Sequence, residues 1–499
     1  MKRAIVGLIA LGLLALPAGA KTLRIGLAED PATFDPTISR LLVDRIVLSA
    51  MCDKLFDISP KLEIVPQLAI SYAWSSDNKA LTLTLRQGVS FQDGEPFDAA
   101  AAKFSIERHL TFPGTSRRGE IAAISGVDIV DDHTIRLNLS APFAPLLSQL
   151  ADRAGMMLAP KAAQAAGDKF GANPVCVGPF KLKERVAQDR NVLVRDPNYW
   201  DKDRVFLDEV LYRPLPDSSV RLANLQSGDL DMIERVAATD MPALRVNKSL
   251  VTASSPELGW TGIVINTANG TGAKLPLGQQ PLLRQAFELS LDRQALNEVV
   301  FNGDFIPGNQ WVPPSSPYYA AGLTIPARDV AKAKRLMAEI GQPNPAVDLI
   351  VLNNPELMRV GEIIQAMAKE AGFEVKLTAM EGASALRAQD QGDYDAALTF
   401  WSGRPDPDGN ISIWAACKAP LNTGHYCNGD LDRLLDEARR RIDPAERRQV
   451  YALATDILLK DRPYIWLFHR RWYWAYTAKL QGFTPYPDGL IRLKDVTLP

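Results

Sequence analysis

The sequence has few of the residues that carry redox or metal chemistry. It holds four cysteines and four histidines in 499 residues, and no two cysteines form a C-x-x-C pair. Zinc sites and thioredoxin-like redox motifs need ligands at such close spacing. Of the histidines, only His425 lies near two cysteines, Cys417 and Cys427. We therefore expect neither a metal nor a cofactor.

Several enzyme motifs are also missing. The chain contains no P-loop, no H-E-x-x-H and no G-x-S-x-G. Paired carboxylates occur at Asp131 and Asp132, which read as a hairpin turn, and at Asp406 and Asp408, which lie in a proline-rich loop. Aspartates in such places usually serve the turn itself. The sequence thus predicts a protein that is not an enzyme.

Neither sign of charge dominates the chain. The chain has 56 Lys and Arg residues and 58 Asp and Glu residues, and 46% of its residues are hydrophobic. This balance is typical of an ordinary globular protein and gives no reason to expect nucleic acid or an anionic membrane as a partner.

The first twenty residues have the pattern of a secretory signal peptide. A positive leader, residues 1–3, precedes an apolar run at 4–16 and the small-residue pattern Ala18-Gly19-Ala20. That run is too short to cross the roughly 30 Å core of a bilayer. We expect cleavage before Lys21 and a soluble, exported protein in the periplasm of a bacterium.

The four cysteines are expected to form disulfides, because the periplasm is oxidising. Three pairings are possible. The close spacing of Cys417 and Cys427 favours a local bridge, which leaves Cys52 with Cys176.

About 480 residues remain after the leader, more than one hydrophobic core usually supports, so at least two lobes are expected. Alternating apolar residues predict strands at 22–28, 80–86, 127–139 with a turn at 131–132, 180–186, 191–196, 261–266, 346–352 and 374–378. Capped apolar stretches predict helices at 41–56, 99–110, 220–227, 281–301, 329–340, 356–371, 430–442 and 444–460. Strands that alternate with helices indicate an α/β fold.

Several short fragments, in this order and spacing, resemble the extracellular solute-binding proteins of the peptide/nickel class (family 5) of ABC importers. They are residues 23–26, 34–36, 85–97, 178–180, 196–200, 226–231, 284–287 and 431–436. The resemblance covers nearly the whole mature chain. Each fragment alone is weak, and most report the fold and say little about the ligand.

The resemblance implies a two-lobe periplasmic binding protein fold, type II-like, with an extra subdomain in the first lobe. We expect lobe I at 21–266 plus 475–499, its inserted subdomain at about 61–175, and lobe II at 267–474. The crossings should fall near 261–266 and 473–478. Ligand would sit between the lobes and hinge closure would bury it.

The implied function is a periplasmic substrate-binding protein that captures a small solute, a peptide or a peptide-like and possibly anionic one, and delivers it to an ABC permease in the inner membrane. A monomer is expected. Alternatives are a binding protein for an opine or metallophore, or a component that presents its solute to a membrane sensor.

The segment 401–408 is the first candidate for the binding site, with Trp401, Arg404 and Asp406 as its expected ligand contacts. The resemblance implies that, in peptide-binding relatives, a tryptophan is followed three residues later by an aspartate that pairs with the peptide amine. Here Arg404 stands three residues after Trp401. A guanidinium prefers a carboxylate and repels an ammonium, so an anionic solute becomes the sharper hypothesis. Alternatively, Arg404 pairs with Asp406 or Asp408 and holds the loop, and Trp401 packs in the core.

Other candidates come from position in the family. Arg117 and Arg118 follow a helix of the inserted subdomain and would face an anion across from Arg404, or lie solvated at the surface. Glu29 and Asp30 follow the first strand, and Trp260 lies at the first crossing.

Overall fold

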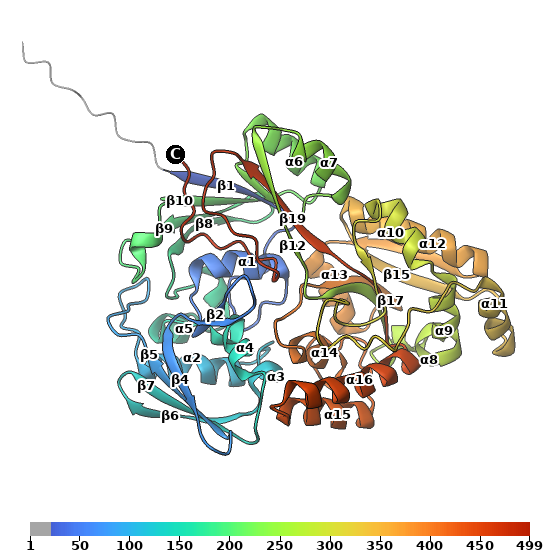
Figure 1. Ribbon diagram of the computed structural model, residues 1–499, viewed down its shortest axis with the longest axis horizontal. Helices are drawn as coiled ribbons and strands as arrows, with labels where there is room; N and C mark the ends of the chain where they lie inside the picture. Colours follow the sequence, from blue (N-terminus) through green and yellow to red (C-terminus); the bar gives the residue numbers. More distant parts are fainter. Residues whose placement is uncertain (1–20) are drawn as a thin grey trace, which may run out of the picture.

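The computed structural model describes residues 21–499, so the predicted signal peptide at 1–20 lies outside the described residues. Two large mixed sheets form the centres of two lobes (Figure 1). Blue to green segments and the red C-terminal segment from residue 471 build the first lobe, and yellow to orange-red segments build the second. The predicted α/β architecture with two lobes is confirmed.

The first lobe is built on a seven-stranded sheet. Its strands, in spatial order, are β12 (Leu250–Pro256), β19 (Arg471–Thr477), β11 (Met232–Glu234), β1 (Thr22–Leu27), β10 (Glu209–Pro214), β9 (Arg190–Arg195) and β8 (Phe180–Val186). Strand β1 pairs in parallel with β10 and β11, and β19 runs antiparallel to its neighbours. The helices of this lobe include α1 (Leu42–Met51), α6 (Ser218–Ser227) and α7 (Met241–Arg245).

A separate four-stranded sheet lies at the lower left of Figure 1. It consists of β4 (Ala69–Trp74), β5 (Ala80–Leu85), β7 (Thr134–Leu139) and β6 (Ile124–Asp131), beside a hairpin of β2 (Phe56–Ile58) and β3 (Ile64–Pro66). Its helices are α2 (Ala99–Thr111), α3 (Arg118–Ile121), α4 (Leu146–Leu150) and α5 (Pro160–Ala166). Asp98 caps α2 by accepting a hydrogen bond from the Ala101 amide, as the sequence predicts.

The second lobe is built on a six-stranded sheet. Its order is β14 (Ile306–Pro307), β18 (Tyr464–His469), β13 (Trp260–Ile265), β17 (Ala396–Trp401), β15 (Ala346–Leu352) and β16 (Glu374–Met380). Its helices are α8 (Pro276–Gln279), α9 (Pro281–Ser290), α10 (Arg293–Phe301), α11 (Val330–Glu339), α12 (Pro355–Ala371), α13 (Gly382–Gln391), α14 (Asp408–Ala415), α15 (Gly429–Arg440) and α16 (Pro444–Asp461). Short 3₁₀ turns lie at Arg153–Gly155, Gly167–Ala172, Lys202–Arg204, Ala238–Asp240 and Gly272–Lys274.

The prediction of a single helix at 281–301 is wrong. The structure breaks it into α9 and α10 at Leu291, whose backbone is extended. Asp292 then accepts a hydrogen bond from the Ala295 amide and so caps a new helix. The local cap outweighs the continuous apolar pattern, because it satisfies a backbone donor that a helix start leaves free.

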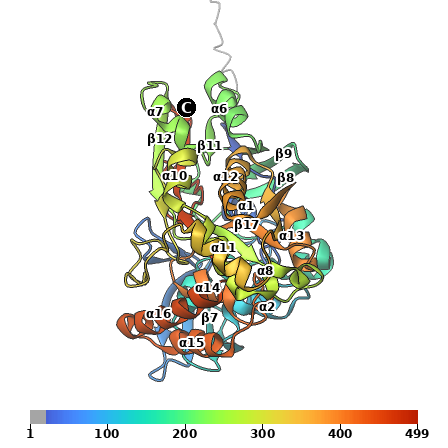
Figure 2. The ribbon, with the colours of Figure 1, turned by 90° about the vertical axis from the view of Figure 1, so that its right-hand side faces the viewer.

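The chain passes between the two large sheets twice. The first passage, residues 257–259, joins β12 to β13, and the second is Arg470, between β18 and β19. Figure 2 turns the molecule so that the second lobe faces the viewer, with α6 and α7 of the first lobe at the top and α15 and α16 at the bottom. From these passages we propose that the lobes meet at residues 257–259 and 470; the other predicted domain boundaries stay predictions.

Candidate functional site

A cavity lies between the lobes and takes its walls from both. It encloses ≈ 650 Å³ that protein atoms do not fill, part of it open to solvent. The lining residues are Glu29, Arg40, Leu41, Leu42, Arg45 and Arg153 from the first lobe, and Leu352, Gly382, Ala385, Leu386, Gln389, Thr399, Phe400, Trp401, Ser402, Trp414 and Leu421 from the second.

Direct contacts hold the lobes together around this cavity. The Arg40 guanidinium donates to Asp390 at 2.6 Å, from the first lobe to the end of α13. The Ala144 amide donates to the carbonyl of Arg439 at 2.9 Å, which brings α15 against the four-stranded subdomain. The structure is therefore that of a closed conformation.

Arginines dominate the wall that the first lobe supplies. Arg45 lies on α1, whose other side chains are mostly buried and apolar, and it donates to Asp152 at 2.7 Å. Arg153 follows α4 and donates to the carbonyl and hydroxyl oxygens of Ser39, at 3.0 and 3.2 Å. Arg40 lies in the loop before α1 and is half-buried.

Two more arginines stand close behind this wall. Arg404 forms an ion pair with the same Asp152 that Arg45 contacts. Arg117 pairs with Glu120 at 2.6 Å and donates to the Ser39 carbonyl at 2.9 Å. We call Arg45, Arg117, Arg153 and Arg404 the arginine cluster; all four side chains are buried.

Positive charge is in excess in the arginine cluster. Among residues 21–499, Asp152 and Glu120 are the carboxylates that pair closely with its four guanidiniums. Asp488 is 3.7 Å from Arg45 but binds Arg492 more closely. Some guanidinium nitrogens have no hydrogen-bond partner in the described structure: Nε of Arg117 and Arg153, Nη2 of Arg404, and Nε and Nη2 of Arg40.

The pKa values of the cluster reflect this crowding. Burial, and then the neighbouring Arg117, hold the pKa of Arg153 well below its usual range. Burial and the nearby Arg45 lower the pKa of Arg404 to about 10. Burial opposes ionisation of Asp152, yet Arg404 and Arg45 lower its pKa well below the usual range. An anion that entered beside these groups would relieve the repulsion among them.

Two other carboxylates lie at the first-lobe wall and make their hydrogen bonds outside the cluster. Glu29 lines the cavity and accepts from Arg235 at 2.7 Å. Asp44 is buried and accepts from the backbone amides of Ala32 and Leu41. Burial raises the pKa of Asp44 to about 6.

The second lobe contributes an aromatic wall. Trp401 donates its indole N–H to the Gly409 carbonyl at 3.0 Å and packs edge-on against Trp414, with ring centroids 5.7 Å apart. The Arg404 guanidinium lies 4.2 Å from the centre of the Trp401 ring. Together with Phe400, these rings suit an apolar or flat part of a ligand, opposite the cationic wall.

The structure brings together four of the eight residues predicted to touch ligand. Trp401 and Glu29 line the cavity, while Arg404 and Arg117 belong to the arginine cluster. The alternative pairing of Arg404 with Asp406 or Asp408 is not found. Asp406 instead accepts two hydrogen bonds of 2.8 Å from Arg447, and Asp408 accepts one of 2.7 Å from Arg439.

The other four predicted residues lie away from the cavity lining. Trp260 is buried in an aromatic cluster with Trp414, 4.9 Å between ring centroids. Asp30 accepts from the Gln188 amide, Arg118 is exposed and donates to a backbone carbonyl, and Asp406 holds Arg447. A ligand contact by any of the eight stays a prediction.

Sequence reasoning missed Arg40, Arg45 and Arg153. A signal for two of them was present: Asp44-Arg45 and Asp152-Arg153 are charged pairs inside otherwise apolar stretches. Buried charges are rare unless they pair or serve a site, so such an interruption of an apolar run marks a candidate.

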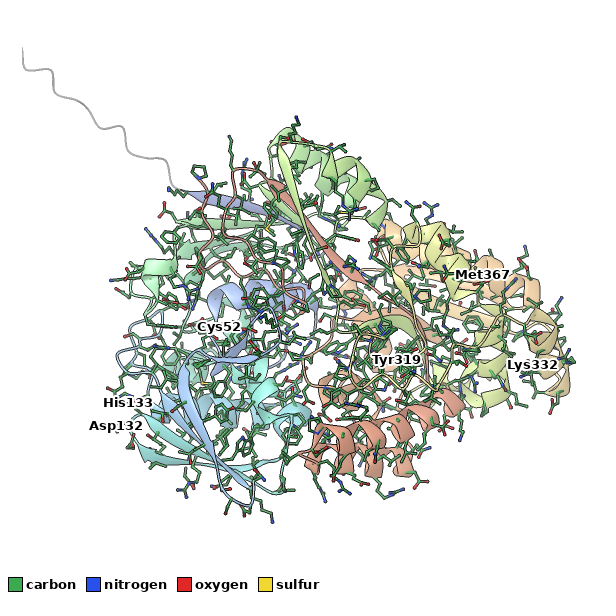
Figure 3. The ribbon with its side chains drawn as sticks, viewed as in Figure 1. Cys52, Asp132, His133, Tyr319, Lys332 and Met367 are labelled. Carbon is green, nitrogen blue, oxygen red and sulfur yellow. A yellow bond between two sulfur atoms is a disulfide. The ribbon has the colours of Figure 1, made fainter. Side chains whose placement is uncertain are left out.

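The predicted disulfides are confirmed. Cys52 bonds to Cys176, and Cys417 bonds to Cys427. Figure 3 shows Cys52 inside the first lobe, at the end of α1, whereas Asp132 and His133 mark the outer turn between β6 and β7. Lys332 and Met367 lie on helices at the far side of the second lobe, away from the site.

Two searches of the described part of the chain concern other partners. In residues 21–499, no three His, Cys, Asp or Glu side chains gather so that they could hold a metal ion. No helix in the same range is both long and apolar enough to span a bilayer.

Known proteins match this chain over nearly its full length. The family model of bacterial extracellular solute-binding proteins, family 5 Middle, matches residues 63–421. The glutathione-binding protein GsiB of Salmonella paratyphi A is 30% identical over 504 residues, which cover 98% of this chain and 97% of that protein.

Solved structures agree with the fold. AgaA from A. tumefaciens R10, in complex with agropinic acid, has a TM-score of 0.88 and 28% identity, covering 96% of this chain and 99% of that one. The periplasmic binding protein DppA of Helicobacter pylori, in complex with the peptide STSA, has a TM-score of 0.87 and 25% identity, covering 96% and 98%.

Proposed function

The chain belongs to the family 5 bacterial extracellular solute-binding proteins of ABC importers, and from that membership we propose that its solute is a small, peptide-like molecule bearing carboxylates. The solute enters between the lobes, which close over it and present it to a membrane permease. The observation that carries this proposal is the cationic wall of the cavity, where Arg40 and Arg153 keep guanidinium nitrogens without a hydrogen-bond partner among the described residues.

The charge of the site favours a carboxylate over an ammonium. A guanidinium binds a carboxylate through paired, charge-assisted hydrogen bonds. Arg40, Arg45 and Arg153 line the cavity, against Glu29 as its carboxylate. Glutathione and agropinic acid, named with two of the relatives, both carry carboxylates. The shared chemistry is an organic acid with polar groups along its length.

Closure follows from contacts on both lobes. A ligand shifts a conformational equilibrium only through its different affinity for the two states. A solute that touches Arg153 of the first lobe and Trp401 of the second gains both contacts in the closed form alone. We propose that the protein works in the periplasm as a monomer, after removal of residues 1–20, and performs no chemistry on its solute.

Native mass spectrometry of the protein purified from its own periplasm tests the solute class. We expect a retained mass that fragments as a carboxylate-bearing molecule. Calorimetry then compares glutathione with its diethyl ester, which has the same backbone and amine without the free carboxylates. Glutathione should bind at least about tenfold more tightly. Equal affinities, or a retained cationic solute, would contradict the proposal.

A pair of variants separates solute contact from lobe contact. Arg40→Gln removes a cavity cation and the ion pair with Asp390 together, whereas Asp390→Asn removes the ion pair and keeps the cation. We expect the first variant to weaken glutathione binding about tenfold and the second less than about threefold, since exposed ion pairs contribute little. Equal weakening would mean that Arg40 acts through the lobes and not on the solute.

A further inference from the structure

A second pocket lies at the first passage between the sheets. It holds ≈ 670 Å³ that protein atoms do not fill, part of it open to solvent. Its walls come mainly from the passage itself, the loop after β14 and the loop after β17, with Leu62, Asn410 and Pro487 from other segments, and most of them are apolar. Leu258, Val312, Tyr318 and Pro407 are among these apolar walls. We call this the passage pocket; its lining shares no residue with the cavity described above.

One buried carboxylate in the passage pocket is only half used. Glu257 is 1% exposed. Its Oε1 accepts a hydrogen bond of 2.9 Å from the backbone amide of Arg470, while its Oε2 has no partner among the described residues. The Arg470 side chain is directed elsewhere, with Nε on Thr261 at 3.0 Å and Nη1 at 3.6 Å from Glu356. A buried carboxylate oxygen without a donor is costly, so it marks a place where a donor is expected.

One buried guanidinium in the same pocket is also incompletely used. Arg404 is 3% exposed. Its Nε pairs with Asp152, and its Nη1 donates to the Gly403 carbonyl at 2.8 Å. Its Nη2 has no acceptor in residues 21–499. The passage pocket thus offers one free acceptor and one free donor on mostly apolar walls. Burial raises the pKa of Glu257 to about 7, and an ammonium beside it would favour its ionised form.

We propose that the passage pocket binds a small zwitterion with an apolar body, such as an apolar amino acid, whose ammonium meets Glu257 and whose carboxylate meets Arg404. The apolar body packs against Leu258, Val312 and Tyr318. A zwitterion satisfies both free groups at once, whereas an ion of either sign leaves one of them buried and unpaired.

This site is independent of the proposed transport solute but touches the same structure. Leu258 belongs to the passage between the lobes, and Arg404 pairs with Asp152, which also holds Arg45 at the wall of the main cavity. A zwitterion in the passage pocket therefore ties the passage to the second lobe and contacts the outer side of the arginine cluster.

Four probes of similar size test the charge requirement on the unmodified protein. They are L-leucine, its linear isomer 6-aminohexanoate, L-leucinamide without the carboxylate, and 4-methylpentanoate without the ammonium. By calorimetry we expect at least one zwitterion to bind, and both single-charge analogues to bind at least about tenfold more weakly. Failure of both zwitterions to bind, or equal binding of an analogue, would overturn the proposal.

A matched pair of variants locates the binding. Glu257→Gln removes the free carboxylate oxygen, while Glu356→Gln neutralises another glutamate near Arg470 that lies outside the passage pocket. We expect Glu257→Gln to weaken zwitterion binding at least about tenfold and Glu356→Gln to leave it within about twofold. Thermal unfolding confirms that each variant is folded, and the probe series on the unmodified protein decides the case if one is not. Zwitterion binding that survives in folded Glu257→Gln places the site elsewhere and refutes the proposal, whatever the result with glutathione.

Discussion

Replacement of Arg153 by methionine should stabilise the ligand-free protein, although it removes a buried side chain that makes two hydrogen bonds. Arg153 is 1% exposed, and its side-chain hydrogen bonds among the described residues go to Ser39 and not to a carboxylate. Replacing a whole buried ion pair by apolar residues of similar volume is often neutral or stabilising by about 1–4 kcal/mol, and an uncompensated buried charge is more costly than a paired one. Loss of the hydrogen bonds from Arg153 to Ser39 costs little free energy, because the Ser39 carbonyl still accepts a hydrogen bond from Arg117. We expect a net gain of about 1–2 kcal/mol in unfolding free energy.

The same change should remove the response to ligand. A ligand at one hundred times its dissociation constant adds about 2.7 kcal/mol to the unfolding free energy. Truncation of one member of a buried, charged contact typically costs about 2–5 kcal/mol of binding. At the glutathione concentration that stabilises the unmodified protein by this amount, Arg153→Met should gain well under about 1 kcal/mol. Urea unfolding with and without glutathione measures both effects.

Arg492 provides the matched control. It is a mostly buried arginine that holds two carboxylates, Asp57 at 2.8 Å and Asp488 at 2.9 Å. Arg492→Met leaves both carboxylates without this partner and should destabilise the protein by about 3–5 kcal/mol. Because Arg492 does not line the cavity, glutathione affinity should change less than about threefold. If Arg153→Met destabilises to the same extent, or still binds glutathione normally, then the reasoning about excess charge is wrong.

Three further changes have expected outcomes. Burial lowers the pKa of His109 to about 4, against about 6.5 in the unfolded chain, so the stability that it contributes above pH 6.5 is lost as the pH falls. Between pH 7 and pH 5, the unfolding free energy of His109→Gln should therefore fall by about 2 kcal/mol less than that of the unmodified protein, as measured by urea unfolding. Cys52→Ala opens a bridge that spans 124 residues and should cost about 5 kcal/mol, against about 3 for Cys417→Ala, whose bridge spans 10; a reversed order would contradict the loop-entropy estimate. Gly403→Ala should cost about 3 kcal/mol, because φ is +82° and a Cβ would lie 2.3 Å from the Leu258 carbonyl carbon; unchanged thermal unfolding would show that the loop can move.

Local signals predicted much of the fold. Helix α12 was expected at 356–371, and the structure shows why: Asn354 caps its first turn and Gly372 ends it with a left-handed backbone. The aromatic-rich strands β18 and β19 were not predicted as a pair, since almost every residue of β18 is apolar and gives no alternation. Their assignment to different sheets depends on Arg470, a single residue whose role only the assembled lobes reveal.

The site was predicted in part. Trp401 and Arg404 stood out by their spacing, and both lie at or next to the cavity. The partner of Arg404 was beyond local reasoning, because Asp152 is about 250 residues away in sequence and on the other lobe. Arg45 carried a local signal, because it is a charged residue inside an apolar helix. Such a signal marks the side chain as a candidate for a site but does not identify the groups that it contacts.

The bridge between Arg40 and Asp390 has a consequence for how tightly the resting protein shuts. Its side chains are 16% and 48% exposed, and a water-bathed pair of this kind contributes about 0–1 kcal/mol. Closure without a solute therefore gains little from this pair. It also forms the buried ion pair of Arg404 with Asp152, but that pair brings a fourth guanidinium beside three others, so an open population should prevail at rest. The bound solute supplies the counter-charge that the guanidiniums lack. When the permease removes the solute, repulsion among these guanidiniums favours reopening of the lobes.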